Sequence, residues 1–367
     1  MKRIICSALC FFVMAFTTNI VYAVSNASNK NSILEAECIG QYQLSVASKI
    51  EIATNKPASY KGSSNQATFS DGQNAPFSQL IYFGDLRIIS PATMSDFIDY
   101  KKHVLSSLEK LREEGISSES EVEQKSALAM KPMSIDKPNL FGWGNEDYMP
   151  GLYYFLDNKI FIHRLTNFEL DDLDRRLLNK KHFEAFLKGF RLRSLYEIPE
   201  KQGVCIPYGF IADDGTTPRN IAVTMRLIDH PDVEIGFQDS TYFEPTVEKG
   251  ELTSGYLNPK DAINSFFNNS GVTNNLEKVE PNFPGYHSIE MDGQKGGAVF
   301  FTIIREDKSK DYGYIAAVKG DDKAGIPSQL LYVIGTASRA KGKPVSKNEL
   351  KDMAEKIMAS VKKHPVQ

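Results

Sequence analysis

The chain has 367 residues, and its 43 Lys and Arg nearly balance its 46 Asp and Glu, which leaves a net charge of −3. This balance excludes the basic excess that nucleic-acid binding requires and the polybasic face that an anionic membrane attracts. The length favours two domains, which we expect over residues 24–200 and 201–367.

Residues 1–23 have the features of a secretory signal peptide. The basic pair Lys2-Arg3 precedes a long apolar run, and the segment closes on a small residue, Ala23. A retained membrane anchor is the alternative, but residues 17–19 (Thr-Thr-Asn) interrupt the run, which fits a lasting span poorly. We therefore expect cleavage after Ala23, export to the periplasm and no stable membrane span afterwards.

Two cysteines, Cys38 and Cys205, remain once this segment is removed. Exported compartments are oxidising, so a lone pair of cysteines there predicts a disulfide. Two separate buried thiols are the alternative. The bond would tie the front of the mature chain to its middle.

The next elements are predicted from apolar spacing and caps. Residues 79–89 predict a strand. Thr93 and Asp96 form a capping box that predicts the start of a helix, and Gly115 predicts its end. The stripe that this helix would bury is Phe97, Tyr100, Val104, Leu108 and Leu111.

A β-hairpin and a second helix follow. Two aromatic and β-branched runs flank Asp157-Asn158-Lys159, which predicts the hairpin. The helix is predicted from apolar residues at helical spacing, namely Phe183, Phe186, Leu187 and Phe190.

The second half shows a similar mixture. Residues 220–240 alternate as two strands around His230-Pro231-Asp232, and Asn258-Pro259 predicts a helix start. Ser346 and Glu349 form the capping box of a last helix. Strands are expected between these helices near 297–305, 312–318 and 329–335. The predicted class is α+β, with two similar domains that each pack a mainly antiparallel sheet with about two helices.

The sequence lacks the common catalytic, nucleotide-binding and metal-binding motifs. It contains no G-x-S-x-G, P-loop, H-E-x-x-H, C-x-x-C or G-x-G-x-x-G. Its histidines are scattered without ligand spacing, and we interpret His163 as a sheet residue and His230 as a turn residue. Asp213-Asp214 would suit acid–base work or cation binding, but the Gly215 that follows favours a turn. We expect no catalytic residue, no metal and no cofactor.

Three stretches carry a resemblance to a known family: "ECIGQYQLSV", "FLKGFRLRSLYEIPEKQGVCIPYGFIADDG" and "RLIDHPDVEIGFQDS". With the signal peptide and the two-part layout, they resemble periplasmic immunity proteins, the cognate antitoxins of type VI secretion phospholipase effectors. The resemblance covers about residues 35–365, and its most specific part is "GVCIPYGFIADDG" at 203–215.

The resemblance implies binding rather than catalysis. The protein would hold a phospholipase toxin between two domains that act as the arms of a clamp, and would block the access of lipid. Cys38–Cys205 would then brace the junction between the arms. Contact residues do not carry over from the family. Our candidates near the junction are Tyr208, Asp213, Asp214 and Asp239.

Two competing functions remain open at this point. A periplasmic carrier of a lipid or another apolar ligand should co-purify with lipid. A secreted enzyme with an unrecognised site should lose activity when one or two of its carboxylates or histidines are replaced. The fold alone does not separate these functions from immunity.

Overall fold

The computed structural model describes the chain from residue 35 onward, with gaps, and the described residues belong to one compact unit, Leu34–Gln367. The expected cleavage site at Ala23 lies outside them. The described residues are 35–57, 66–129, 131–132, 137–144, 151–164, 184, 186–241, 246–248, 251–253, 260, 263, 266, 276–321 and 325–365.

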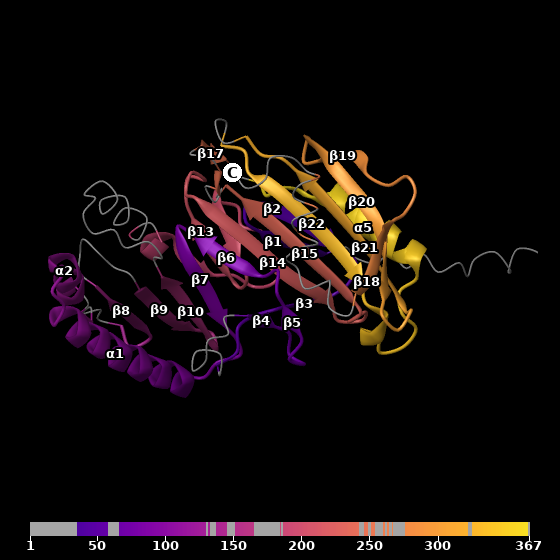
Figure 1. Cartoon of the computed structure of the whole chain (residues 1–367). Coiled ribbons are helices and arrows are strands. Elements are labelled where there is room, and N and C mark those ends of the chain that lie inside the picture. Colours follow the sequence, from indigo (N-terminus) through magenta and orange to yellow (C-terminus); the bar gives the residue numbers. More distant parts are fainter. Residues whose placement is uncertain are drawn as a thin grey trace, which may run out of the picture. The chain divides into compact units, whose positions relative to one another are not determined.

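One large antiparallel sheet runs through the described part of the chain (Figure 1). Its strands are β3 (Ile50–Ile52), β6 (Gln79–Tyr82), β7 (Gly84–Ile89), β8 (Leu140–Trp143), β9 (Gly151–Leu156), β10 (Lys159–Arg164), β14 (Arg219–Leu227), β15 (Val233–Ser240), β18 (Leu276–Pro281), β19 (His287–Met291), β20 (Gln294–Arg305), β21 (Lys310–Val318) and β22 (Ser328–Gly335). Their order is β18-β20-β21-β22-β15-β14-β6-β7-β10-β9-β8, and β19 pairs with β20 while β3 pairs with β14. Strands from both halves of the sequence therefore pair in one sheet.

Smaller sheets and a few helices complete the described structure. The small sheets are β1-β2-β23 (Glu35–Ile39, Tyr42–Val46, Lys362–Lys363), β11-β13-β12 (Phe190–Leu192, Gly209–Ala212, Gly203–Ile206), β4-β5 (Ala67–Thr68, Asn74–Ala75) and β16-β17 (Thr246–Glu248, Glu251–Thr253). The helices described over their full length are α1 (Met94–Ile116), α2 (Glu121–Ala129), α5 (Lys347–Ser360) and the short 3-10 helix Ala337–Arg339.

Alternate residues of the large sheet point to opposite faces, and each face has its own core. On the inner face, residues such as Val223, Phe237 and Val333 pack against β1, β2, β12, β13 and α5. On the outer face, α1 covers one end of the sheet by packing on residues such as Ile160 and Ile162. The other end of the outer face packs against Ile263 and Phe266, and these residues belong to a cluster that includes Leu330, Tyr332 and Ile334.

The α+β class with mainly antiparallel sheets is confirmed. Both capping boxes are present, at Thr93 and at Ser346, because a cap depends only on residues three positions apart. The two hairpins predicted around residues 157–159 and 230–232 are present as β9–β10 and β14–β15. The division at residue 200 stays a prediction.

Three local predictions need correction or fall outside the described residues. The strand expected at 79–89 breaks at Phe83, whose φ is 60°, and β6 turns back on β7 as a hairpin. Leu111 is 51% exposed, so the buried stripe of α1 ends at Leu108. Phe190 starts β11 rather than continuing the helix that contains the buried Phe186. Phe183 and the helix start at Asn258-Pro259 lie outside the described residues.

Candidate functional site: a polar groove beside a buried junction

The predicted disulfide joins the first strand to the middle of the chain. Cys38 on β1 and Cys205 on β12 are bonded, with their Cα atoms 5.7 Å apart, and both are buried. Two backbone hydrogen bonds lie beside the bond, from Gly40 N–H to the Cys205 carbonyl at 2.8 Å and from Cys205 N–H to the Gly40 carbonyl at 2.7 Å. The junction is therefore fixed by main-chain pairing as well as by the sulfurs.

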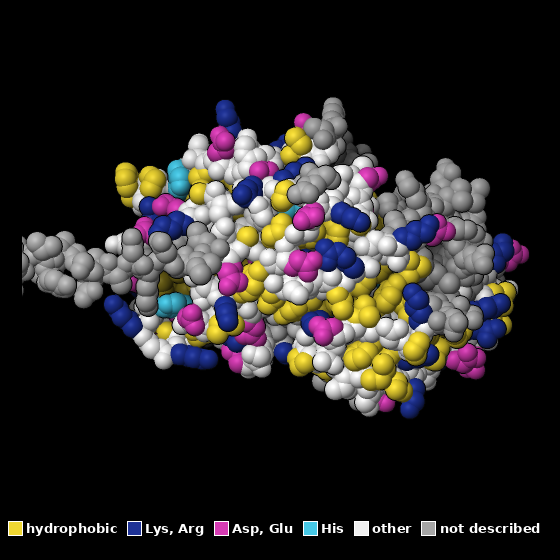
Figure 2. All heavy atoms as spheres, turned by 180° about the vertical axis from the view of Figure 1, so that it is seen from behind, with side chains coloured by type: hydrophobic (Ala, Val, Ile, Leu, Met, Phe, Trp, Pro, Cys, Tyr) yellow, Lys and Arg dark blue, Asp and Glu magenta, His cyan; other side chains and the backbone are white. Residues whose placement is uncertain are grey.

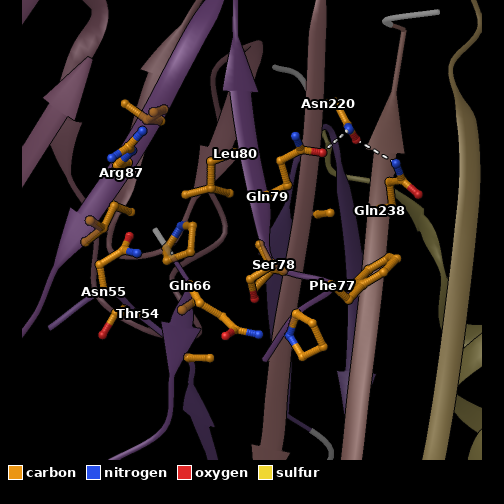
Figure 3. Close-up of a pocket in the computed structure, with 18 of the residues that line it drawn as sticks. Thr54, Asn55, Gln66, Phe77, Ser78, Gln79, Leu80, Arg87, Asn220 and Gln238 are labelled. Atoms are coloured by element: carbon orange, nitrogen blue, oxygen red, sulfur yellow. Dashed lines mark hydrogen bonds between the residues drawn. The ribbon is translucent and has the colours of Figure 1, made fainter. Parts of the chain in front are cut away.

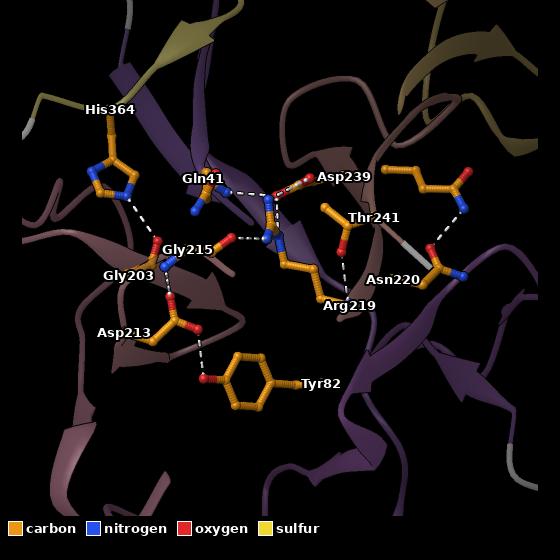
Figure 4. A network of polar contacts seen from close by, with 11 residues as sticks. Gln41, Tyr82, Gly203, Asp213, Gly215, Arg219, Asn220, Asp239, Thr241 and His364 are labelled. Carbon is orange, nitrogen blue, oxygen red and sulfur yellow. Dashed lines mark hydrogen bonds and ion pairs between the residues drawn. The ribbon is translucent and has the colours of Figure 1, made fainter. Parts of the chain in front are cut away.

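Arg219 and Asp239 form a buried ion pair next to this junction (Figure 4). Arg219 Nε donates to Asp239 Oδ2 at 2.9 Å and Nη2 donates to Oδ1 at 3.2 Å, and neither side chain is exposed. Oδ2 also accepts the backbone N–H of Gln41 at 2.8 Å. Burial alone would lower the pKa of Arg219, but the Asp239 carboxylate outweighs it and the pKa is raised. A bidentate pair with a third donor satisfies the buried charge.

Gly40 is required at this point of the chain. Its φ is 60°, and a Cβ there would lie 2.1 Å from Asp239 Oδ2. The close approach of backbone and carboxylate leaves no room for a side chain.

A second buried ion pair is formed by Glu37 and Arg193. Arg193 Nη2 also donates to the Cys38 carbonyl at 3.1 Å, and Nη1 donates to the Glu197 carbonyl at 3.0 Å. Glu37 accepts the backbone N–H of Tyr196 at 2.7 Å. Charged residues thus connect β1 to the segment around β11 and β12.

The expected acidic turn at Asp213-Asp214 is present and is held by its own hydrogen bonds. Asp213 Oδ1 accepts Gly215 N–H at 2.6 Å, and Oδ2 accepts the Tyr82 hydroxyl at 2.6 Å. Burial, followed by the Asp213 carboxylate, raises the pKa of Tyr82. Asp214 is exposed and accepts Thr216 N–H at 3.0 Å. The two carboxylates therefore have structural partners within the turn and on β6.

The four contact candidates differ in their access to a partner. Asp214 is exposed, and Asp213 and Tyr208 are half-buried, with Lys159 Nζ 4.9 Å from the Tyr208 ring centre. Asp239 is fully buried in its ion pair, so its selection as a surface contact was wrong. The other three stay predictions.

The histidines interpreted as structural have structural surroundings. The His163 ring is buried, stacks on Phe186 and donates from Nε2 to the Tyr82 carbonyl at 2.8 Å. His230 lies in its turn, with Nδ1 3.9 Å from Asp232 Oδ1. Within the described residues, Cys38, Cys205 and His364 have ligand-type atoms close together, but the two sulfurs are bonded to each other and offer no thiolate.

A groove with a volume of about 600 Å³ opens on the outer face of the large sheet. It lies at β14, β6 and β7, between the part covered by α1 and the part that packs against Ile263 and Phe266. Its lining combines apolar residues such as Phe77 and Leu80 with polar side chains from both halves of the chain (Figure 3). The outer face is apolar at both ends and polar in this middle section.

Three carboxamides form a hydrogen-bonded row along the groove. Gln238 Nε2 donates to Asn220 Oδ1 at 2.7 Å, and Asn220 Nδ2 donates to Gln79 Oε1 at 3.2 Å (Figure 3). Arg87 is the only Lys or Arg among the described residues that line the groove, and its Nη2 pairs with Asp85 Oδ2 at 2.6 Å. The groove therefore offers neutral hydrogen-bonding groups and no uncompensated cation.

The family comparison bears on the half of the chain that contains the second cysteine. Residues 197–365 match the family model of the Tle cognate immunity protein 4 C-terminal domain. This part of the chain is therefore similar to an immunity-protein domain. The resemblance to immunity proteins of type VI secretion lipase effectors is thereby confirmed. No curated protein matches the sequence.

Solved immunity proteins share the fold over nearly the whole chain. The immunity protein TplEi of the type VI secretion system of Pseudomonas aeruginosa, complexed with "L" peptide, is 12% identical with a TM-score of 0.56, and the match covers 92% of this chain and 100% of that chain. Its apo structure gives a TM-score of 0.54 at 12% identity, over 91% and 98% of the two chains. The Tle4–Tli4 complex gives 0.57 at 13% identity, also over 91% and 98%.

The disulfide and the groove each combine residues of the matched segment with residues that precede it. The matched residues include Cys205, Arg219 and Asp239, whereas Cys38 and Gln79 precede them. None of the described helices is long and apolar enough to cross a membrane. Figure 2 shows acidic and basic side chains interspersed on the rear face, with hydrophobic side chains in a band between them.

The sequence did not reveal the ion pairs or the carboxamide row. Glu37 and Arg193 are buried charges that lie 156 positions apart, and Arg219 meets Asp239 across the β14–β15 hairpin. An isolated arginine at the start of an apolar strand is the signal that would have indicated Arg219. Asn220 and Gln79 have the pattern of ordinary outward-facing strand residues, so spacing alone gives no indication of a groove.

Proposed function

We propose that this immunity protein binds a phospholipase effector of the type VI secretion system in the periplasm and inhibits it by blocking the access of lipid. The match of residues 197–365 to the Tle cognate immunity protein 4 domain carries the proposal. The similarity of the fold to the solved Tle4–Tli4 complex supports it. Inhibition needs no catalytic group in the inhibitor.

The periplasmic location is supported by the signal-peptide pattern of residues 1–23 and by the oxidised cysteine pair. Amino-terminal sequencing of the purified native protein tests it. We expect a chain that begins after Ala23 and that co-fractionates with periplasmic markers. An intact Met1, or a lipid on Cys10, contradicts the proposal.

The clamp is a separate part of the proposal. A two-armed grip gains effective concentration once the first arm is bound, and its interface should exceed the usual ~1,600 Å². Tyr208, Asp213 and Asp214 are proposed contacts near the junction, and a few aromatic or arginine anchors should dominate the binding energy. The junction with its disulfide and ion pairs would keep the arms at a fixed spacing.

The decisive experiment uses the full mature chain and the lipase encoded beside it. We expect a one-to-one complex and loss of phospholipid hydrolysis by the lipase. If hydrolysis is unaffected, or if the chain cleaves lipid by itself, the immunity function is wrong. Co-purification with bound lipid would favour the carrier instead.

Lysine cross-linking of the same complex tests the clamp. Lys101 and Lys102 on α1 and Lys347 and Lys351 at α5 report on the two ends of the sheet. A clamp predicts cross-links to the lipase from both ends. If cross-links form from one end alone while inhibition is complete, the immunity function is supported and the two-armed clamp is contradicted.

A further inference from the structure

The groove is a built polar site rather than an uncovered hydrophobic face. Where α1 packs, the outer face presents Ile160 and Ile162, and near Phe266 it presents Leu330 and Tyr332. Between these two regions the outward residues include Gln79, Asn220 and Gln238, and none of the helices α1, α2 and α5 covers them. We propose that this groove binds an extended, uncharged polypeptide segment of the effector, an inference that rests on the proposed function.

The carboxamide row suits a polypeptide backbone because it ends in one donor and one acceptor. Within the row, Gln238 donates and Gln79 accepts. The Nε2 group of Gln79 and the Oε1 atom of Gln238 therefore have no partner within the row. A backbone offers a carbonyl and an N–H at every residue other than proline, so an extended segment meets both ends of the row.

Charge argues against a phospholipid in the same place. A phosphate headgroup needs a cation, and the one Lys or Arg of the described lining, Arg87, is already paired with Asp85 at 2.6 Å. An acyl chain would press hydrocarbon on the three carboxamides and remove them from water, which is unfavourable without new hydrogen bonds. A neutral polar backbone has neither problem.

The apolar residues of the lining supply places for side chains. Phe77 is half-buried and meets the rings of Phe266 and Tyr332 at centroid distances of 5.8 and 4.9 Å. The volume of about 600 Å³ lies within the usual range for a binding cleft. Backbone bonds would supply affinity and these residues selectivity, as in other modes of peptide recognition.

Gln79→Glu in the full mature chain is the sharpest test. The carboxylate keeps the acceptor for Asn220 Nδ2 but replaces the Nε2 donor with an oxygen that repels a peptide carbonyl. Gln79 is exposed, so the fold tolerates the change. We expect the affinity for the lipase, purified in catalytically inactive form, to fall about tenfold. Gln43→Glu on β2 is the matched control, with the same charge change outside the groove, and should bind normally.

A photo-cross-linking residue at position 79 identifies the occupant. We expect one lipase segment to be labelled, and vesicles of phosphatidylethanolamine and phosphatidylglycerol to leave the yield unchanged. If wild-type protein and Gln79→Glu bind the lipase equally, or if the vesicles displace the lipase from position 79, the groove proposal is overturned while immunity stands. If the wild-type protein itself neither binds nor inhibits the lipase, the proposed function fails, and the groove proposal with it.

Discussion

Asp239 holds two strands that are distant in the sequence, because its carboxylate pairs with Arg219 on β14 and accepts the backbone N–H of Gln41 beside β2. Both charged side chains are fully buried. Each charge is thus stable only while the other is present.

The first prediction concerns this pair. Asp239→Asn leaves Arg219 as an uncompensated buried charge, so the free energy of unfolding should fall by about 3–5 kcal/mol in denaturant titrations. Asp352→Asn on the exposed side of α5 is the control and should change it by less than ~0.5 kcal/mol. Replacing both partners, as in Arg219→Met with Asp239→Leu, should recover much of the loss. Equal stability of Asp239→Asn and Asp352→Asn would show that the pair is unimportant.

A second prediction concerns the disulfide between Cys38 and Cys205, which are 167 positions apart. Cys205→Ala should lower the free energy of unfolding by ~2–5 kcal/mol, because the unfolded chain regains the freedom of a long loop. Cys38→Ala should cost the same, and a reductant should abolish the difference between either variant and the wild type. Thiol labelling of the unfolded, unreduced protein gives the direct reading, and two reactive thiols there would contradict the bond.

A third prediction follows from His163. Burial lowers the pKa of its ring below the ordinary value of 6.5, so the folded state binds fewer protons than the unfolded state at acid pH. Stability from this residue is complete above pH 6.5 and is lost as the pH falls below it. His163→Gln keeps a donor for the Tyr82 carbonyl and should flatten the pH dependence of the unfolding free energy in that window. Parallel pH profiles for variant and wild type would exclude this role.

The fourth prediction concerns Gly236 on β15. A Cβ at this position would lie 1.9 Å from Cε1 of the buried Tyr332 ring. The Tyr332 hydroxyl holds this ring in place, because it donates to Glu234 Oε1 and accepts a hydrogen bond from Thr224 Oγ1. Gly236→Ala should therefore lower the melting temperature, with a cost of about 1–3 kcal/mol from overpacking. A Cβ at Gly342 would have no atom within 4 Å, so Gly342→Ala serves as the control. A melting temperature equal to that of Gly342→Ala would mean that the ring moves aside freely.

Elements that depend on neighbouring residues were predictable from the sequence. The capping boxes at Thr93 and Ser346 and the hairpin around Asp157 each rest on a few adjacent positions. The turn at Phe83 was missed because the residue at its tip is an aromatic one, and the single Gly84 that follows it does not by itself interrupt the apolar pattern of a strand. A phenylalanine with positive φ is rare, and only the pairing of Leu80 with Leu86 makes it necessary.

The candidate site was harder to predict for a different reason. Arg193 and Glu37 are separated by 156 positions, so their contact depends on how the sheets stack rather than on any local pattern. Asn220 and Gln79 form part of a groove because, among the described residues, α1, α2 and α5 leave the outer face uncovered between two apolar clusters. The disulfide between Cys38 and Cys205 could be predicted from the sequence, because only two cysteines remain after signal cleavage and an oxidising compartment favours their pairing.

The pairing of β2 with β23 has a consequence for the timing of folding. Tyr42 pairs with Lys363, and Ser45 N–H donates to Ser360 Oγ, 315 positions further along the chain. The long hairpins of the large sheet close locally and therefore early, whereas β2 must wait for a partner at the far end of the sequence. For a chain that emerges N-terminus first, this small sheet is the last piece to be completed, and until then one edge of β2 is open to pairing with another molecule.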